Sequence, residues 1–444
     1  MSMNAAIEPQ QSEFSVRISR FWIVFGIGAL VGFIWVLPVF GPPGVELSKQ
    51  GNGASAIRFL RLIAPLFVFF IIRRPVYLKI AHSLLLYFPQ GRISRAGLRI
   101  FGVILVLGII PLVSGLLTVN TNFLISAVFP LTLSVVTLIG LVLLDEKTLK
   151  YWVMGATAMT LIFLVLGMFT THFEVTNYWG RPRIVLGFIH PIYTASAILG
   201  GMIFFFLTMG LRVQKMPTAT RFLVIGIYLV VSLALLVFAQ DRNQLVMVVL
   251  SLIGIVNLRK LGQRIKFSIF AFLLLLPVAL YLFVIFGSDA NPVWAAVNTY
   301  SSERLSFFQD ILVANLNLSD SRILFEASEN RQSAFTELAG FAATDSVYLT
   351  FLINYGIFAL LLFVTFLLFL GKRLSEIPEA TGALGILCGL VILYALDASG
   401  VTTSNLILFI LLAYVVRTAV LKTDTRQAAS LSTEVVLPRS IARR

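Results

Sequence analysis

The sequence has few charged residues, few histidines and almost no cysteine. Charged residues make up 12% of the 444-residue chain, histidine occurs three times, and Cys388 is the only cysteine. A soluble globular protein usually has about 25% charged residues, so this chain cannot cover a water-facing surface of its size. One cysteine also excludes an intramolecular disulfide framework. These shortages exclude a cytoplasmic enzyme, a disordered scaffold and a secreted disulfide module.

Familiar metal and nucleotide motifs are missing from the sequence as well. There is no HExxH motif, no Cys/His cluster and no paired-carboxylate helix motif, so we expect no metal and no cofactor. There is also no Walker motif and no GxGxxG loop, which excludes ATP-driven transport by this chain alone. The interpretation therefore depends on the apolar runs and on where the cations lie.

Hydrophobic residues make up 58% of the chain and occur in long runs. A helix needs roughly 20 mostly apolar residues to cross a bilayer core of about 30 Å. Twelve runs of about that length lie at 21–40, 57–72, 100–118, 123–144, 151–170, 191–211, 222–239, 243–258, 267–287, 347–370, 381–397 and 404–421. The sequence therefore predicts an all-α, polytopic integral membrane protein with about 12 transmembrane helices.

The runs and the gaps between them predict five regions. These are a cytoplasmic N-terminal tail at 1–20, transmembrane helices one to nine within 21–287, a large periplasmic loop at 288–345, transmembrane helices ten to twelve within 346–421, and a cytoplasmic basic tail at 422–444. A long loop in a compact bundle is usually functional or disordered. Helix-like periodicity at 294–316, together with Trp, Phe and Leu residues, favours a folded piece that packs against the bundle.

The positive charge indicates the orientation of the chain. The net charge is +14, and most of the 34 Lys and Arg residues fall inside when the N-terminus is placed in the cytoplasm. Cytoplasmic loops of membrane proteins carry such an excess of cations. We therefore expect both termini to be cytoplasmic. The excess charge favours contact with anionic membrane lipids and argues against nucleic acid as a partner.

Several arginines nevertheless fall on the outer face, where the positive-inside bias should deplete them. They are Arg181 and Arg183 before the sixth run, Arg242 at the tip of a tight hairpin, and Arg304, Arg322 and Arg331 in the large loop. Guanidinium groups present planar, paired donors that match phosphate oxygens. Several of them in one cavity would form a site for a diphosphate or another polyanion.

A structural alternative stays open for each of these groups. Arg322 lies among acidic neighbours and suits a solvated ion-pair surface. Arg181 follows two aromatic residues and suits a headgroup anchor. Arg242 adjoins Asp241 and suits a local clamp, although charges at the mouth of a membrane bundle are functional by default. His190 precedes a proline, where helix capping or packing would explain it equally well.

Asp345 lies where the large loop ends and the tenth run begins. Thr344, Asp345 and Ser346 all suit a helix N-cap, and an aspartate there is commonly no more than a cap. The functional alternative is a carboxylate at the membrane boundary that takes a proton from an attacking sugar hydroxyl. Asp397, near the outer end of the eleventh run, is a second acidic candidate, although a local turn bond suits it better.

Four segments together resemble the bacterial O-antigen ligase and polymerase superfamily. They are GRPRIVLGFIHPIYTASAIL, FAQDRNQLVMVVL, SSERLSFFQDIL and TDSVYLTFLINYGIFALL, in that order. In the family's ligases the last segment reads His, then Asn or Ser, then nine residues, then Gly. Here Asp345 and Ser346 are followed by the nine residues 347–355 and then by Gly356. The order and spacing of the segments carry the resemblance, which covers about residues 120–420.

Three departures point to the polymerase branch of the family. Asp345 stands where the ligases have His, Ile192 where Asn is usual, and Asp241 where Ser precedes the arginine. Loss of the His argues against a lipid A-core ligase and is more in keeping with Wzy-type polymerases of exopolysaccharide, capsule or O-antigen. The substitution leaves the identity of the catalytic base open.

The resemblance implies a metal-independent, inverting glycosyltransferase on the outer face of the inner membrane. It would move a glycan from undecaprenyl diphosphate onto the next lipid-linked repeat unit. The implied catalytic residues are Asp345 as base and Arg242 and Arg304 on the diphosphate; the implied substrate-binding residues are Arg183, Arg181, His190, Arg322 and Tyr348. Undecaprenyl-diphosphate-linked oligosaccharides and membrane lipids are the expected partners. Whether a chain-length regulator also binds is left open.

Three other functions remain as alternatives. A ligase of the same family would add its glycan once to a lipid A-core or another acceptor, whereas a polymerase would produce a ladder of repeat units. A lipid-linked oligosaccharide or solute transporter would concentrate charge at the membrane midplane, but here the predicted span interiors are nearly uncharged. A purely structural assembly scaffold would tolerate loss of every outer arginine.

Overall fold

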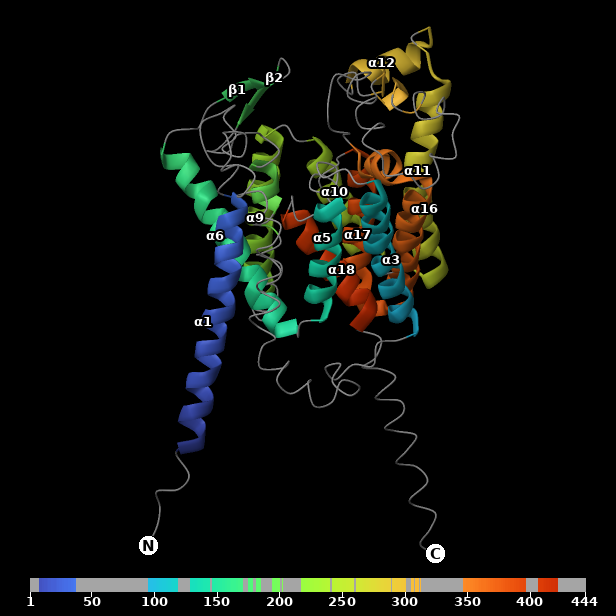
Figure 1. Ribbon diagram of the computed structural model, residues 1–444. Coiled ribbons are helices and arrows are strands. Elements are labelled where there is room, and N and C mark those ends of the chain that lie inside the picture. Colours follow the sequence, from blue (N-terminus) through green and yellow to red (C-terminus); the bar gives the residue numbers. More distant parts are fainter. Residues whose placement is uncertain are drawn as a thin grey trace, which may run out of the picture. The chain divides into compact units, whose positions relative to one another are not determined.

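The computed structural model is a helical protein (Figure 1). Its chain divides into two compact units. Unit 1 comprises Met1–Pro89, Leu143–Leu245 and Thr403–Leu411; unit 2 comprises Gln90–Val142, Val246–Thr402 and Leu412–Arg444. The structure describes residues 8–36, 95–118, 128–143, 146–170, 175–178, 181–184, 194–199, 202, 217–239, 242–258, 261–288, 290–300, 305, 306, 308–310, 312, 346–396 and 406–421. The helical class expected from the apolar runs is confirmed.

Unit 1 contains α1 (Glu8–Val36), α6 (Glu146–Thr170), α9 (Thr218–Ala239) and the short strands β1 (Val175–Tyr178) and β2 (Arg181–Ile184). Residues 194–199 are also helical. Two further helices, α10 (Arg242–Asn257) and α18 (Leu406–Leu421), begin in unit 1 and continue into unit 2.

Unit 2 contains the longest apolar helices. Its elements are α3 (Arg95–Thr118), α5 (Phe129–Leu143, whose last residue is assigned to unit 1), α11 (Gln263–Phe286), α12 (Pro292–Tyr300), α16 (Val347–Glu376), the 3-10 turn η5 (Pro378–Ala380) and α17 (Thr381–Leu396). Helix α16 packs against α3, α11 and α17.

The helices follow the predicted apolar runs closely. A helix covers most of every run except 57–72, which lies outside the described residues, and 191–211, of which only a short helical part is described. Two described helices, α11 and α16, are long and apolar enough to cross a membrane, and six described helical stretches are apolar but shorter. These helices indicate membrane association. The number of spans, the membrane concerned and the side on which the termini lie stay predictions.

Small residues bring α1 and α6 into close contact within unit 1. A Cβ atom added to Gly28 would overlap the main chain of Trp152, and one added to Gly155 would overlap the main chain of Phe25. The ring centroids of Phe33 and Phe163 lie 5.8 Å apart farther along the same pair of helices. Glycine at the interface allows two backbones to approach closely, which is a common way to hold apolar helices together in a membrane.

Helix α16 is interrupted at Gly356, which the sequence pattern had singled out. Gly356 has φ 82° and ψ 173°, and the regular helical conformation resumes after it. This region of backbone conformation is essentially restricted to glycine. The glycine therefore permits the sharp bend inside α16 that any other residue would oppose.

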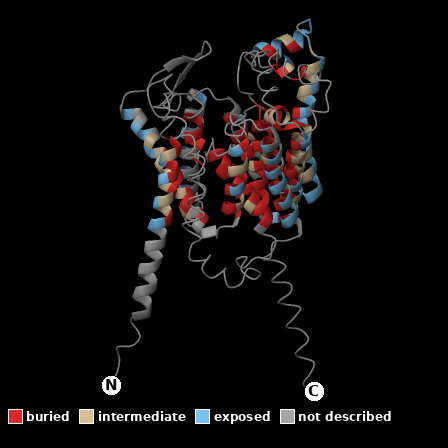
Figure 2. Cartoon of the chain, in the orientation of Figure 1, coloured by how far each residue is buried: buried red, intermediate tan, exposed pale blue. Residues whose placement is uncertain are grey.

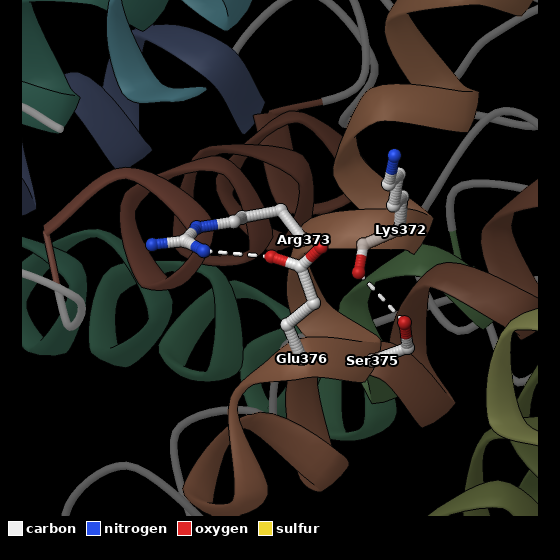
Figure 3. Close-up of polar contacts among 4 residues, drawn as sticks. All are labelled: Lys372, Arg373, Ser375 and Glu376. Carbon is white, nitrogen blue, oxygen red and sulfur yellow. Dashed lines mark hydrogen bonds and ion pairs between the residues drawn. The ribbon is translucent and has the colours of Figure 1, made fainter. Parts of the chain in front are cut away.

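Helices α11 and α16 run antiparallel within unit 2. The Phe270 ring lies where a Cβ of Gly371 would be, near the start of α11 and the end of α16. At the opposite ends, Val284 of α11 packs with Leu349 of α16. The end of α16 is closed by an ion pair from Arg373 Nη1 to Glu376 Oε2, 2.7 Å, and by a nearby Ser375 hydroxyl bond (Figure 3).

One segment expected to be a loop forms a β-ladder instead. Strands β1 and β2 pair antiparallel in unit 1, with Tyr178 opposite Arg181 and Thr176 opposite Arg183. Two residues, Trp179 and Gly180, separate them in the sequence. Val, Thr and Tyr followed by a turn that contains glycine are a hairpin signal, and the long apolar runs around this segment obscured it.

Candidate functional site

Residues from the predicted large loop fold onto α11 and α16 and form one apolar cluster. We call it the α12 cluster; its buried members are Val284, Trp294, Leu305, Phe308, Leu312, Leu349 and Ile353. All of them belong to unit 2. The prediction of a folded, helical piece within 294–316 that packs against the bundle is therefore confirmed for its described residues. The cluster contains no charged residue, so its role is structural: it holds in place the segments that contribute residues to it.

Hydrogen bonds hold the segment after α12 in place. Asn298 Nδ2 donates to Ser306 Oγ at 2.6 Å, and Ser306 N donates to Asn298 Oδ1 at 3.1 Å. Gln309 Nε2 also donates to the Gly287 carbonyl at 2.9 Å, which ties this segment to the end of α11. Asn298 is buried, and a buried amide without partners would be costly. The paired bonds therefore fix residues 298 and 306 relative to each other.

Ser346 connects the three helices α11, α16 and α17 beside the α12 cluster. Its hydroxyl lies 2.6 Å from the Tyr281 hydroxyl of α11 and donates to the Tyr394 carbonyl of α17 at 3.1 Å. It also accepts from Leu349 N and so caps α16. Ser346 is fully buried. The start of α16 is thus fixed to α11 and α17 through one side chain.

This cap answers one alternative left open by the sequence. The N-cap of α16 is Ser346, so the capping role considered for Asp345 is filled by its neighbour. Asp345 itself lies outside the described residues. Because an N-cap position holds one residue, capping of α16 no longer accounts for an aspartate at 345.

The chain neighbours of Arg304 and Asp345 lie in the same part of unit 2. Leu305, the residue after Arg304, is a member of the α12 cluster, and Leu349 of the same cluster donates to Ser346, the residue after Asp345. Tyr281 connects the two sides, because it bonds to Ser346 and its ring lies edge-on to that of Phe308, with centroids 6.2 Å apart. Arg304, like Asp345, lies outside the described residues.

The remaining predicted site residues of unit 1 are only partly described. Arg242 is the first residue of α10, and Arg181 and Arg183 are on β2, but their side chains are not described. His190 lies outside the described residues. Two of the family-like segments are nevertheless linked within this unit, because Gln244 Nε2 donates to Ser196 Oγ at 3.0 Å and both residues are buried.

The two remaining predicted substrate residues fall in unit 2. Arg322 lies outside the described residues. Tyr348 is 4% exposed, donates its hydroxyl to the Val391 carbonyl at 3.2 Å and packs beside the Phe363 ring. These contacts give Tyr348 a structural role at the α16–α17 contact. Its role as a substrate ligand stays a prediction.

Sequence reasoning missed most of the residues that position this region. Tyr281 is one aromatic residue in a long apolar run, and the pairing of Asn298 with Ser306 leaves no recognisable motif. Ser346 gave the only usable signal, because serine suits a helix N-cap. The sequence could therefore suggest where α16 begins, but not which helices its first residue would join.

Comparison with known proteins gives no match: no family model, no curated protein and no solved structure matches this chain. What is shown is a helical protein in which two of the described helices are long and apolar enough to cross a membrane. Its function has to be argued from the residues themselves.

Proposed function

We propose that the protein is a membrane-embedded, metal-independent inverting glycosyltransferase of the polysaccharide-polymerase class. Its substrates are undecaprenyl-diphosphate-linked oligosaccharides, and it works at the periplasmic face of a bacterial inner membrane. The growing glycan is transferred from its lipid diphosphate to the non-reducing end of the next lipid-linked repeat unit. The proposal combines the family resemblance of the sequence with the arrangement of unit 2.

One observation carries the proposal. Leu305 and Ser346, which directly follow Arg304 and Asp345, lie in one packed region of unit 2. Tyr281 connects its two sides through its bond to Ser346 and its ring contact with Phe308. Successive Cα atoms are about 3.8 Å apart, so each proposed catalytic residue is one step along the chain from that region. A guanidinium for a diphosphate and a carboxylate for a hydroxyl proton are the two groups that this transfer needs. Their neighbours Leu305 and Ser346 are about 40 positions apart in the sequence; Leu305 belongs to the α12 cluster, and Ser346 accepts a hydrogen bond from Leu349 of that cluster.

The proposed reaction is a single displacement step. The Asp345 carboxylate takes the proton of the acceptor hydroxyl while the hydroxyl oxygen attacks the anomeric carbon of the donor glycan. The bond from that carbon to the diphosphate oxygen breaks, and the configuration at carbon inverts. Negative charge develops on the leaving diphosphate, where the Arg304 guanidinium stabilises it more strongly than in the ground state.

The other predicted residues keep the roles that the resemblance implies. Arg242 is a second diphosphate ligand, with Arg183 behind it, and these assignments rest on the sequence. Arg181, His190 and Arg322 are proposed glycan or diphosphate contacts on the same grounds. The bond from Gln244 to Ser196 supports a fixed start for α10, two residues from Arg242.

The placement of charges in the described helices bears on the transporter alternative. The charged residues of α11 are confined to its first turn, and those of α16 to its last two turns. Ion- or proton-coupled transporters place charges in the middle of their spans, so this distribution favours an enzyme at the membrane surface over a transporter. A ligase of the same chemistry differs only in its acceptor and in adding one glycan.

The proposal is tested in cells by changing the two proposed diphosphate ligands. Arg242→Ala and Arg304→Ala should each abolish long-chain polymer while the amount of membrane-inserted protein stays normal. Arg264→Ala is the matched control, because Arg264 is exposed in the first turn of α11 and has no proposed role. Unchanged chain length in both test variants would overturn the assignment.

A further inference from the structure

Helix α12 exposes an apolar face among the residues that the structure describes. Trp294 and Asn298 are buried, whereas Val293 is 62% exposed and Val297 is 40% exposed. Pro292 and Ala296 are also exposed, and α12 carries both exposed and buried colours in Figure 2. The helix PVWAAVNTY carries no charged residue. In water, such a helix would expose branched apolar side chains without any charge beside them, which is unusual for a solvated surface.

Helix α12 packs at the end of α11, whose last turns also carry exposed side chains. Phe286, the last residue of α11, is 83% exposed, and Leu282, one turn earlier, is 50% exposed. Trp294 fixes α12 against α11 by packing over Gly287, which a Cβ atom would prevent. Since α11 is long and apolar enough to cross a membrane, its exposed side chains suit lipid. The exposed face of α12 therefore lies at the end of a helix whose own exposed side chains suit a bilayer.

We infer that α12 is an interfacial helix that rests its Val293 and Val297 face in the headgroup region of the bilayer. Interfacial helices bury an apolar face to a depth of about 5–10 Å and keep a polar face toward water. In α12 the side that bears Trp294 and Asn298 packs onto the protein, so a charged face is unnecessary. The occupant of the uncovered face is phospholipid.

The depth of α12 has a consequence for the proposed diphosphate ligand. Arg304 is four residues beyond the end of α12 and lies, in sequence, between Asn298 and Ser306, which bond to each other. Leu305, the residue after Arg304, is buried in the same cluster as Trp294 of α12, and successive Cα atoms are about 3.8 Å apart. The diphosphate of a lipid-linked glycan also lies at headgroup level. This consequence rests on the proposed function; the position of α12 does not.

The experiment measures depth in full-length protein with Cys388→Ala, so that one introduced cysteine carries an environment-sensitive fluorophore. Labels go on Val293→Cys, Val297→Cys and, as control, Thr299→Cys, which is exposed on the polar edge of the same helix. The protein is reconstituted into vesicles of phosphatidylcholine and phosphatidylglycerol, with and without lipids brominated near the top of the acyl chain. Ala296→Cys replaces either apolar position if that variant does not fold.

The fluorescence emission of labels at 293 and 297 should be blue-shifted and strongly quenched by the brominated lipid. The emission of the label at 299 should be quenched mainly by aqueous iodide. Equal iodide quenching at all three positions would overturn the inference. So would protection from both quenchers, because the chain itself or a second copy would then cover the face. Arg304→Ala should leave the quenching unchanged. If Arg304→Ala abolishes polymer but α12 is exposed to water, only this inference is wrong. If α12 contacts lipid but Arg304→Ala still makes normal polymer, only the proposed function is wrong.

Discussion

The hydroxyl groups of Tyr281 and Ser346 lie 2.6 Å apart and join the end of α11 to the first residue before α16. The bond ties two distant parts of the sequence at the residue that follows Asp345. Ser346 is also held by the Tyr394 carbonyl, so its position depends on two neighbouring helices. Any role of Asp345 in catalysis would use this anchor.

Tyr281→Phe should cause a large loss of turnover but only a small loss of folding stability. The change removes one hydrogen bond, which costs about 0.5–1.5 kcal/mol of folding free energy, but it also loosens the residue beside the proposed base. We expect kcat for polymerisation to fall while KM for the lipid-linked substrate changes little. Purified protein in detergent gives both values, together with the thermal midpoint Tm.

Ser375→Ala is the control for this change. It also removes one hydroxyl bond from α16, to the Lys372 carbonyl at 2.6 Å, but at the opposite end of the helix. It should lower Tm comparably and leave kcat unchanged. Equal loss of kcat in both variants would show that stability alone accounts for the effect of Tyr281.

Asn298→Ala should weaken the fold of the segment that contains Arg304. The buried amide exchanges two hydrogen bonds with Ser306, and leaving Ser306 without its partner should cost about 1–3 kcal/mol. Because the residues around Arg304 become less fixed, we expect KM for the lipid-linked donor to rise. Thr299→Ala is the matched neighbour, since Thr299 donates to the Ala295 carbonyl one turn earlier in the same helix. A normal KM in Asn298→Ala would contradict the positioning role.

Gly28→Ala should destabilise unit 1, whereas Gly26→Ala should not. A methyl group at Gly28 would overlap the Trp152 main chain, while nothing lies within 4 Å of a Cβ at Gly26. Forcing two packed helices apart costs about 1–3 kcal/mol. Thermal unfolding of the two detergent-solubilised variants, followed by size-exclusion chromatography, measures the difference. The same Tm for both would mean that α1 and α6 do not pack closely.

Gly356→Ala should be costly because of backbone conformation and not for lack of space alone. The φ of 82° at this position is strained for any residue with a side chain, and such strain costs about 1–3 kcal/mol. Gly382→Ala in α17 is the control, since its Cβ would meet nothing within 4 Å. We expect a lower Tm for the first variant only. Equal Tm values would argue against the bend at Gly356.

The sequence predicted the helices well because an apolar run of this length has few other structures open to it. It also predicted the folded piece that contains Trp294 and Phe308, since large apolar residues in a loop need somewhere to pack. The hairpin at β1 and β2 was missed because strands of four residues are too short for periodicity to stand out.

The candidate site was predictable only as a set of residue types. Outer-face arginines and Asp345 could be selected from charge and position, but the contacts that anchor their neighbours could not. Ser346, Tyr281 and Tyr394 meet through hydroxyl and carbonyl groups that are far apart in the sequence. Such bonds depend on how the helices pack, and no local pattern encodes that packing.

The most direct test of the central claim is the product formed by purified protein from lipid-linked repeat units. The unmodified protein should convert them to a ladder of increasing chain length, without added metal, and Arg304→Ala and Asp345→Asn should yield only the starting unit despite a normal Tm. Ladders from both variants, or no ladder from the unmodified protein with intact substrate, would contradict the account.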